Sequence, residues 1–283
     1  MTILFLDGHN LMHRARSGFQ LGDYNVVYNF FRSLKPLVDQ FKPTRVYFTL
    51  EGHPKKRYEM LPTYKANRHV VVDPTATPEE VDAAQKKYKS LEDFHRQKDV
   101  IVNMLALHFP MSVMRHPDFE ADDLVYNVIK NASTAVEFVV VSSDSDFIQL
   151  LQEFPNVKLY NPIAKAFVEA PAYDYITWKA LRGDGSDNIP GIPGVGDKTA
   201  ETVLEDPTAL EKLLLEHKDV FERNVELIRL ARWTEEELKQ VASSRPEKDW
   251  SLVEKRFLEM EFKSMIKEPY WTKFKATFDT LWG

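Results

Sequence analysis

The sequence contains no cysteine among its 283 residues. That absence excludes a disulfide scaffold, a cysteine-based zinc finger and a thiol nucleophile, and it agrees with a reducing compartment. Long apolar runs are missing too, since none approaches the roughly 18 residues of a membrane-spanning helix. The apolar run at 3–6 ends at Asp7 and has no basic segment before it, unlike a secretory signal peptide. We therefore expect a cytoplasmic protein with no membrane partner.

An excess of positive charge is also lacking, because the formal net charge is -6. A uniformly basic nucleic-acid-binding protein is thereby excluded, but a nucleic-acid enzyme is not. A carboxylate-rich metal site lowers the net charge and leaves room for local basic patches. With 43% hydrophobic residues, a chain of this length can bury one large core or two modest ones.

Apolar segments alternate with helical patterns along much of the chain. Strands are predicted at 3–6, 45–50, 111–114, 136–141 and 157–160, with 167–168 pairing nearby. Helices are predicted at 26–40, 94–108 and 176–181, after Asp123 and from residue 147. Thr77-Pro78 offers an N-cap and a proline at the first helical position, so a helix can also start there. The alternation predicts an α/β fold with a mostly parallel sheet flanked by helices.

Acidic residues follow three of these strands. Asp7 comes after the first strand, Glu51 after the second, and Asp144 and Asp146 after the fourth. In a parallel, doubly wound sheet, ligands bind beyond the carboxyl ends of the strands. We therefore expect these carboxylates to converge at one edge of the sheet.

The densest acidic stretch is Glu120-Ala121-Asp122-Asp123, which has apolar neighbours on both sides. Repulsion makes such a cluster unfavourable unless a cation or solvent neutralises it. Mg²⁺ and Mn²⁺ prefer oxygen ligands, and two such ions about 4 Å apart can activate a water and stabilise the leaving oxygen of a phosphodiester. The predicted metal ligands are Asp7, Glu51, Glu120, Asp122, Asp123, Asp144, Asp146, Asp184 and Asp187.

Each of these carboxylates also has a simpler interpretation. Asp7 can cap a following helix, and Asp122 and Asp123 can be first-turn residues stabilised by the helix dipole. The acidic pair after the fourth strand can form an ordinary turn with an N-cap, and Asp184 and Asp187 can be loop residues. Individually these alternatives stay open. Jointly they are weaker, because the acidic residues recur after strands while neighbouring loops are not especially acidic.

A basic segment runs from Lys42 to Arg68, where seven lysines and arginines stand against two acidic residues. Within it, Lys65 and Arg68 can offset the negative charge that develops on a scissile phosphate. Tyr64 can stack on a base. A solvated basic turn is the alternative for this segment.

Glycine and proline become frequent after about residue 183. Gly191–Thr199 resembles a helix-hairpin-helix element, in which backbone amides and a helix N-terminus approach phosphates. The DNA-binding residues predicted there are Gly191, Gly194, Val195, Gly196, Lys198 and Thr199. A tight turn between two helices explains the glycines equally well. Residues 206–283 look mainly helical, and we expect them to pack as a C-terminal bundle.

Five motifs follow one another in a fixed order: Leu6-Asp7-Gly8, 64–68, 120–123, 143–146 and 183–199. In this order they resemble the flap endonuclease and 5′-3′ exonuclease family of bacteria and bacteriophages, which includes the N-terminal nuclease domain of bacterial DNA polymerase I. The resemblance implies a PIN-like core over 1–172, with an arch over about 65–98 through which single-stranded 5′ ends pass. It also implies a helix-three-turn-helix element and a helical C-terminal region over 173–283.

The resemblance further implies roles for individual side chains. The first metal ion would be held by Asp7, Glu120 and Asp122. The second would be held by Asp144, Asp146 and Asp184. Asp123 and Asp187 would act through water, and Lys65 and Arg68 would be the catalytic cations.

The resemblance also bears on the glycine hairpin and on Glu51. The glycine hairpin would bind the duplex, with a K⁺ ion held by backbone carbonyls. Glu51 departs from the aspartate that is common at its position, and its longer side chain would reach the first metal directly or through water.

We therefore expect a monomeric, metal-dependent 5′ nuclease that cleaves phosphodiester bonds at 5′ ends, flaps and single-strand/duplex junctions of DNA. Replication or repair in a bacterial cell or a phage-infected host is the expected setting, with RNA/DNA primers as further substrates. Two alternatives remain: an RNase H-like ribonuclease that removes RNA primers, and a non-catalytic DNA junction-binding protein. The latter would be expected to have lost several carboxylates, and nearly all are present here.

Overall fold

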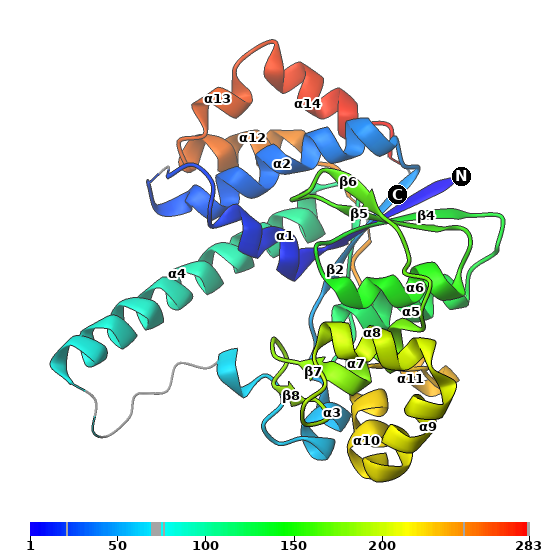
Figure 1. The fold of residues 1–283 in the computed structure, drawn as a ribbon. Helices are drawn as coiled ribbons and strands as arrows, with labels where there is room; N and C mark the ends of the chain where they lie inside the picture. Colours follow the sequence, from blue (N-terminus) through cyan, green and yellow to red (C-terminus); the bar gives the residue numbers. More distant parts are fainter. Residues whose placement is uncertain (21, 69–74, 76, 246, 282–283) are drawn as a thin grey trace.

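A seven-stranded sheet forms the centre of the protein in the computed structural model, which describes residues 1–20, 22–68, 75, 77–245 and 247–281 (Figure 1). The strand order is β6-β5-β4-β1-β2-β3-β9. The strands are β1 (Thr2–Asp7), β2 (Arg45–Leu50), β3 (Ser112–Arg115), β4 (Glu137–Val141), β5 (Val157–Asn161), β6 (Ala166–Val168) and β9 (Ala242–Ser243). The pairings from β5 to β3 are parallel, and β6 and β9 pair antiparallel at the two edges. The predicted α/β fold with a mostly parallel sheet is confirmed.

Helices cover both faces of this sheet. The helices of the described residues are α1 (Gly8–Ala15), α2 (Asn25–Phe41), α3 (Lys55–Met60), α4 (Pro78–His108), α5 (Ala121–Lys130), α6 (Ile148–Glu153), α7 (Tyr175–Arg182), α8 (Asp197–Glu205), α9 (Pro207–Glu216), α10 (Lys218–Ile228), α11 (Glu235–Lys239), α12 (Trp250–Glu259), α13 (Lys263–Ile266) and α14 (Tyr270–Phe278). Within the described part of the chain, no helix is both long and apolar enough to cross a lipid bilayer.

Strand β1 shows why its apolar run does not alternate with polar residues. Leu4 and Leu6 belong to the core shared with α2, whereas Ile3 and Phe5 belong to the core shared with α5 and α6. Figure 1 shows α1 and α2 on one side of the sheet and α5 and α6 on the other. A parallel strand covered on both faces needs apolar side chains on both. Asp7, at the carboxyl end of β1, therefore lies near the middle of the sheet.

Three helices, α1, α3 and α4, differ from the prediction. Helix α1 was not predicted, because its short sequence is mostly polar and only Leu11, Met12 and Ala15 give it a buried apolar side. Helix α4 is one helix of 31 residues that begins with a capping box at Thr77 and Glu80. The helix start expected at Thr77-Pro78 is thus confirmed. Residues 69–74 and 76 of the expected arch lie outside the described residues.

The two halves of α4 lie in different environments. Its buried side chains begin at Phe94 and include Ile101 and Leu105, whereas the turns before Phe94 carry no buried side chain. Figure 1 shows this first half projecting away from the sheet. The helix is therefore anchored at its C-terminal half only.

The expected C-terminal bundle is wrong. Helices α12 and α14 pack on α4 and α2 in the main core, where Phe257 meets Phe31 with ring centroids 5.3 Å apart. Helix α10 packs instead on α7, in a separate lobe with α8 and α9. Helical periodicity identifies an apolar face but not the surface that covers it. The division of the chain at residue 173 stays a prediction.

Candidate metal centre and active site

A cavity of about 900 Å³ opens beyond the carboxyl ends of the central strands. Helix α4 supplies the facing wall through Tyr88, Leu91 and Phe94. Seven of the nine predicted carboxylates line this cavity: Asp7, Glu51, Glu120, Asp122, Asp144, Asp146 and Asp187. The convergence expected at this edge of the sheet is therefore present.

Two groups of three carboxylates bring their oxygens together within 4.8 Å of one another. The first group is Glu120, Asp122 and Asp123, and the second is Asp146, Asp184 and Asp187. Oxygen-only donor sets of this kind suit hard divalent cations and offer no soft ligand. The residues present therefore fit two divalent metal ions.

Asp7 shows that a structural role and a metal role need not exclude each other. One carboxylate oxygen accepts a hydrogen bond from the amide of Asn10, at 3.1 Å, and so caps α1. The other oxygen accepts from the Ser142 hydroxyl at 2.6 Å. The same carboxylate lines the cavity. Capping thus orients Asp7 at the end of β1.

Glu120 is surrounded by hydrogen-bond donors. Its Oε1 accepts from Lys65 Nζ, and its Oε2 accepts from Arg57 and from the Tyr64 hydroxyl, the latter at 2.8 Å. Burial by itself would raise the pKa of Glu120, but Arg57 and then Lys65 hold the pKa at about 2. Glu120 therefore stays ionised without a metal ion.

Glu51 and Asp122 lie in the same cavity without such partners. Burial, followed by the charge of Glu120, raises the pKa of Glu51 to about 8. Burial and the neighbouring Asp123 raise the pKa of Asp122 well above its ordinary value. Glu51 Oε2 accepts one hydrogen bond, from the Ala121 amide at 3.1 Å. These two groups resist ionisation until a cation arrives.

Lys179 on α7 neutralises the second group, although no sequence motif identified it. Its ammonium contacts Asp146 and lies 2.6 Å from Asp184. The side chain is only 3% exposed, and the single available signal was a lysine on the buried face of an amphipathic helix. Burial and then Asp146 raise the pKa of the neighbouring Asp144 to about 7. The Lys179 ammonium thus supplies the positive charge that the buried carboxylates Asp146 and Asp184 require.

The basic motif at 64–68 docks on the loop that carries Asp187. The Lys65 amide donates to Asp187 O at 2.9 Å, and Asn67 and Asn188 tie the two loops together through Gly185 O at 2.8 Å and Thr63 O at 2.7 Å. Lys65 has a positive φ of 54°, a strained conformation that a non-glycine residue keeps only when its surroundings enforce it. Two segments far apart in sequence therefore position this cation jointly.

Tyr64 does not fulfil the predicted stacking role. Its ring is only 2% exposed and packs among apolar side chains such as Ile189 and Leu227. Its hydroxyl bridges Glu120 and Asp187, at 2.8 Å and 2.9 Å. A base cannot reach a buried ring, so the stacking prediction is wrong. The sequence does not distinguish a base-stacking tyrosine from a buried, hydrogen-bonding one, because in both cases a tyrosine lies beside cationic residues.

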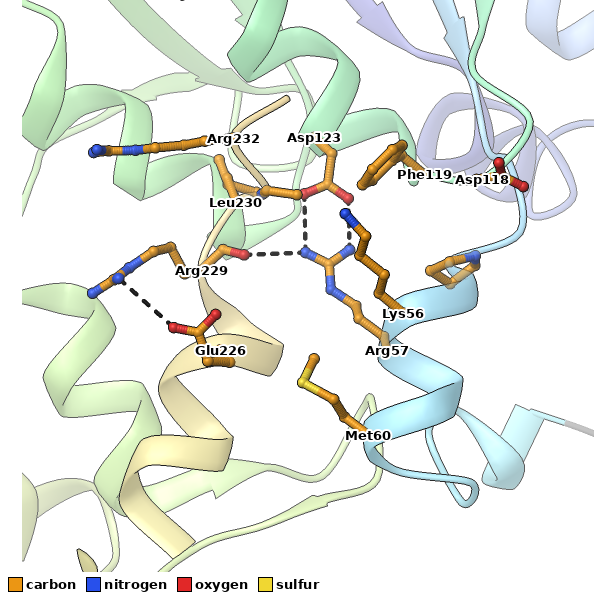
Figure 2. Close-up of a pocket in the computed structure, with 12 residues that line it drawn as sticks. Lys56, Arg57, Met60, Asp118, Phe119, Asp123, Glu226, Arg229, Leu230 and Arg232 are labelled. Atoms are coloured by element: carbon orange, nitrogen blue, oxygen red, sulfur yellow. Dashed lines mark hydrogen bonds and ion pairs between the residues drawn. The ribbon is translucent and has the colours of Figure 1, made fainter. Parts of the chain in front are cut away.

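Asp123 does not line the 900 Å³ cavity but a second one of about 310 Å³. Its two oxygens accept from Arg57 at 2.7 Å and 3.0 Å, and Oδ1 also accepts from the Ala231 amide at 2.7 Å (Figure 2). The side chain is fully buried. Arg57, which sequence reasoning treated as one more basic residue, is thus a central structural residue here. A water-mediated metal role for Asp123 stays a prediction that these contacts do not support.

The predicted hairpin connects α7 to α8. Gly194 has a positive φ of 80°, and a Cβ at Gly191 would approach Arg182 O to 2.2 Å, so both positions require glycine. Gly196, Lys198 and Thr199 are exposed at the start of α8. Val195 instead packs partly against the core that contains Ile192 and Ala200. The loop thus presents backbone and a lysine to solvent.

Comparison with known proteins agrees with this architecture. Residues 2–177 match the family model for the N-terminal resolvase-like domain of 5′-3′ exonuclease, and residues 170–245 match the model for its C-terminal SAM fold. A 5′-3′ exonuclease of Mycobacterium tuberculosis is 28% identical over 239 residues, or 75% of this chain and 72% of the relative. The thermostable DNA polymerase I of Thermus filiformis is 32% identical over 225 residues, or 75% of this chain but only 24% of the polymerase.

Two solved structures share the fold. A T5 5′-exonuclease with bound zinc ions has a TM-score of 0.63 at 21% identity and covers 81% of this chain and 90% of that chain. The bacteriophage T5 flap endonuclease, in a complex with DNA and metal ions, has a TM-score of 0.63 at 16% identity and covers 99% of both chains. Since the first family model alone covers more than half of the residues, the chain belongs to the 5′-3′ exonuclease family.

Proposed function

We propose that this protein is a metal-dependent 5′ nuclease that acts on DNA ends, flaps and single-strand/duplex junctions. The observation that carries the proposal is the cavity in which carboxylates of both groups meet the cations Lys65 and Arg68. Membership of the 5′-3′ exonuclease family supports the reaction. The structurally similar T5 flap endonuclease is described with DNA and metal ions, which supports the substrate.

The proposed metal ligands divide between two Mg²⁺ or Mn²⁺ ions. Asp7, Glu120 and Asp122 would hold the first ion, with Glu51 beside it. Asp144, Asp146 and Asp184 would hold the second, with Asp187 beside it. Two ions bound there would supply a nucleophilic water and neutralise charge on the scissile phosphate.

Lys65 and Arg68 are the proposed phosphate-binding cations. Lys65 contacts Glu120 and Arg68 contacts Asp187. A metal ion on either carboxylate would weaken that contact and release the cation toward the phosphate. The two residues would then stabilise the negative charge that grows in the transition state.

The duplex is proposed to bind the hairpin between α7 and α8. Gly191, Gly194, Gly196, Lys198 and Thr199 would approach the phosphates through backbone amides and one ammonium group, a contact that reads charge and shape. Carbonyls of the same loop are proposed to hold K⁺. The projecting half of α4 would form part of the arch for the single strand.

Cleavage of a 5′-flap oligonucleotide tests the proposal. We expect cleavage in Mg²⁺ or Mn²⁺ that stops on chelation, with matched DNA and RNA flaps reporting the preferred sugar. Asp144→Asn should nearly abolish cleavage and retain DNA binding. Asp118→Asn, which changes a carboxylate outside the cavity, is the matched control. Absence of cleavage in both metals would contradict the proposed function.

A further inference from the structure

Arg57 is a buried arginine whose guanidinium is fully used. Nε donates to Leu227 O at 2.9 Å, and one terminal nitrogen donates to Glu120 and to Asp123, the latter at 2.7 Å. The other terminal nitrogen donates to Asp123 at 3.0 Å and to Arg229 O at 3.3 Å. These contacts account for all the N–H groups of an arginine. Figure 2 shows the guanidinium between Asp123 and the backbone of Arg229.

The backbone partners of Arg57 belong to a strap, which we define as residues 227–233. The strap begins in the last turn of α10 and runs past α5 and α6, to which it is hydrogen-bonded. Gln149 accepts from the Leu230 amide at 3.1 Å and donates to Ile228 O at 3.0 Å. Asn127 accepts from Trp233 at 3.0 Å and donates to Ala231 O at 2.7 Å. Buried side chains therefore fix the strap almost residue by residue.

Glu120 is the point at which this strap meets the metal centre. Two neighbours, Arg57 and Tyr64, occupy Oε2, while among the described residues Oε1 accepts from the ammonium of Lys65 alone. The Lys65 ammonium can move away from Glu120 when a metal ion binds, because it lies at the end of a flexible side chain. Arg57 cannot leave, because Asp123 and two carbonyls hold it.

We propose that Arg57 is a positioning residue for the first metal ion: it fixes Glu120 with one free oxygen and links that carboxylate to the strap from the helical lobe. The inference deepens the proposed function and rests on it. Glu120 then offers Oε1 to the ion in an orientation that is set before binding. Groups behind a metal ligand that orient it typically change metal affinity by about 10- to 100-fold when they are removed.

A lysine cannot replace Arg57 in this position. It keeps the positive charge but has three donors at a single point, which cannot serve two carboxylates and two carbonyls together. Gln149 provides the matched control, because it holds the same strap through two hydrogen bonds and is also buried. No hydrogen bond or ion pair found for Gln149 in the described residues involves a carboxylate of the first group.

Mn²⁺ binding to the DNA-free protein, measured by calorimetry, tests the proposal. We expect Arg57→Lys to raise the Mn²⁺ concentration at half-saturation of the tighter site by tenfold or more, and Gln149→Leu by less than twofold. Melting temperatures should fall by several degrees in both variants. Equal Mn²⁺ affinities, or equal losses in the two variants, would overturn the positioning role. A wild-type protein that binds no Mn²⁺ would instead overturn the proposed function.

Chemical rescue keeps the test decisive if Arg57→Lys does not fold. A cavity of about 310 Å³ adjoins Arg57, so ethylguanidinium can enter the space left in Arg57→Ala. We expect ethylguanidinium to restore Mn²⁺ affinity and ethylammonium, its matched control, to restore little. Failure of ethylguanidinium to restore Mn²⁺ binding would overturn the proposal.

Discussion

The two carboxylate groups are neutralised in opposite ways. In the first, Arg57 lies behind Glu120 and stays there, and Lys65 lies in front of it. In the second, Lys179 lies between Asp146 and Asp184, which are themselves proposed ligands. A cation behind a ligand orients it, whereas a cation between ligands competes with the metal ion for the same oxygens. We therefore expect the first group to bind divalent ions more tightly than the second.

The largest effects should follow from removing one charge in each group. Glu120→Gln and Asp146→Asn should each lower the single-turnover cleavage rate by about 1,000-fold, because each weakens metal binding that contributes several kcal/mol to transition-state stabilisation. Glu120→Gln should also abolish the tighter Mn²⁺ binding event in calorimetry, while Asp146→Asn should spare it. Loss of the tighter event in Asp146→Asn alone would reverse our assignment.

Replacing Lys179 should affect stability next. Lys179→Met leaves Asp146 and Asp184 buried without their cation, and breaking such a pair costs about 3 kcal/mol in the free energy of unfolding. Urea unfolding in chelator should show this loss, and Mg²⁺ should recover more of it than in wild type, because the ion takes the place of the ammonium. Lys158→Met, which breaks an exposed pair with Glu137, should change stability by less than about 0.5 kcal/mol. A Mg²⁺ response equal to wild type would show that Lys179 does not compete with metal.

The pH dependence should distinguish Glu51 from Glu120. Glu51 has a folded-state pKa raised to about 8, so above its unfolded value of roughly 4.5 the folded state keeps a proton that the unfolded state loses. The free energy of unfolding in chelator should therefore fall as pH rises from about 4.5 to 8. Glu51→Gln should reduce the slope of the free energy of unfolding against pH by an amount that corresponds to at most about one bound proton. Glu120, whose pKa is lowered to about 2, contributes stability across this range that is lost only as pH falls toward that value. An unchanged slope in Glu51→Gln would contradict the raised pKa.

The smallest effect should come from outside both groups. Lys198→Ala on the exposed start of α8 should weaken binding of duplex DNA by several-fold and lower the slope of log affinity against log salt by about one. The single-turnover rate at saturating DNA should not change. Lys212→Ala on α9, an exposed lysine of the same lobe, is the control. Equal losses in the two variants would place the duplex elsewhere.

Much of the fold and the site followed from local patterns in the sequence. The strand at 45–50 was predicted with the bounds that the structure shows, because a buried strand needs an apolar run of its own. The capped start of α4 was legible from Thr77, Pro78 and Glu80, since capping involves neighbouring residues. Acidic residues after strands were enough to predict that these carboxylates converge at one edge of the sheet. Helix α1 and the packing of α12–α14 were not predicted, because short polar helices and remote packing surfaces leave no local pattern.

Sequence alone therefore predicted that the carboxylates after the strands gather at one edge of the sheet, since the carboxyl ends of parallel strands share that edge. Only the tertiary structure decided how each one is neutralised. Arg57 comes from α3, Lys179 from α7 and Lys65 from a loop held by Asp187, and none of these distances along the chain predicts a contact. The pKa of a carboxylate depends on burial and on charges a few ångströms away. For that reason Glu120 and Glu51, which have the same side chain and line the same cavity, differ in pKa.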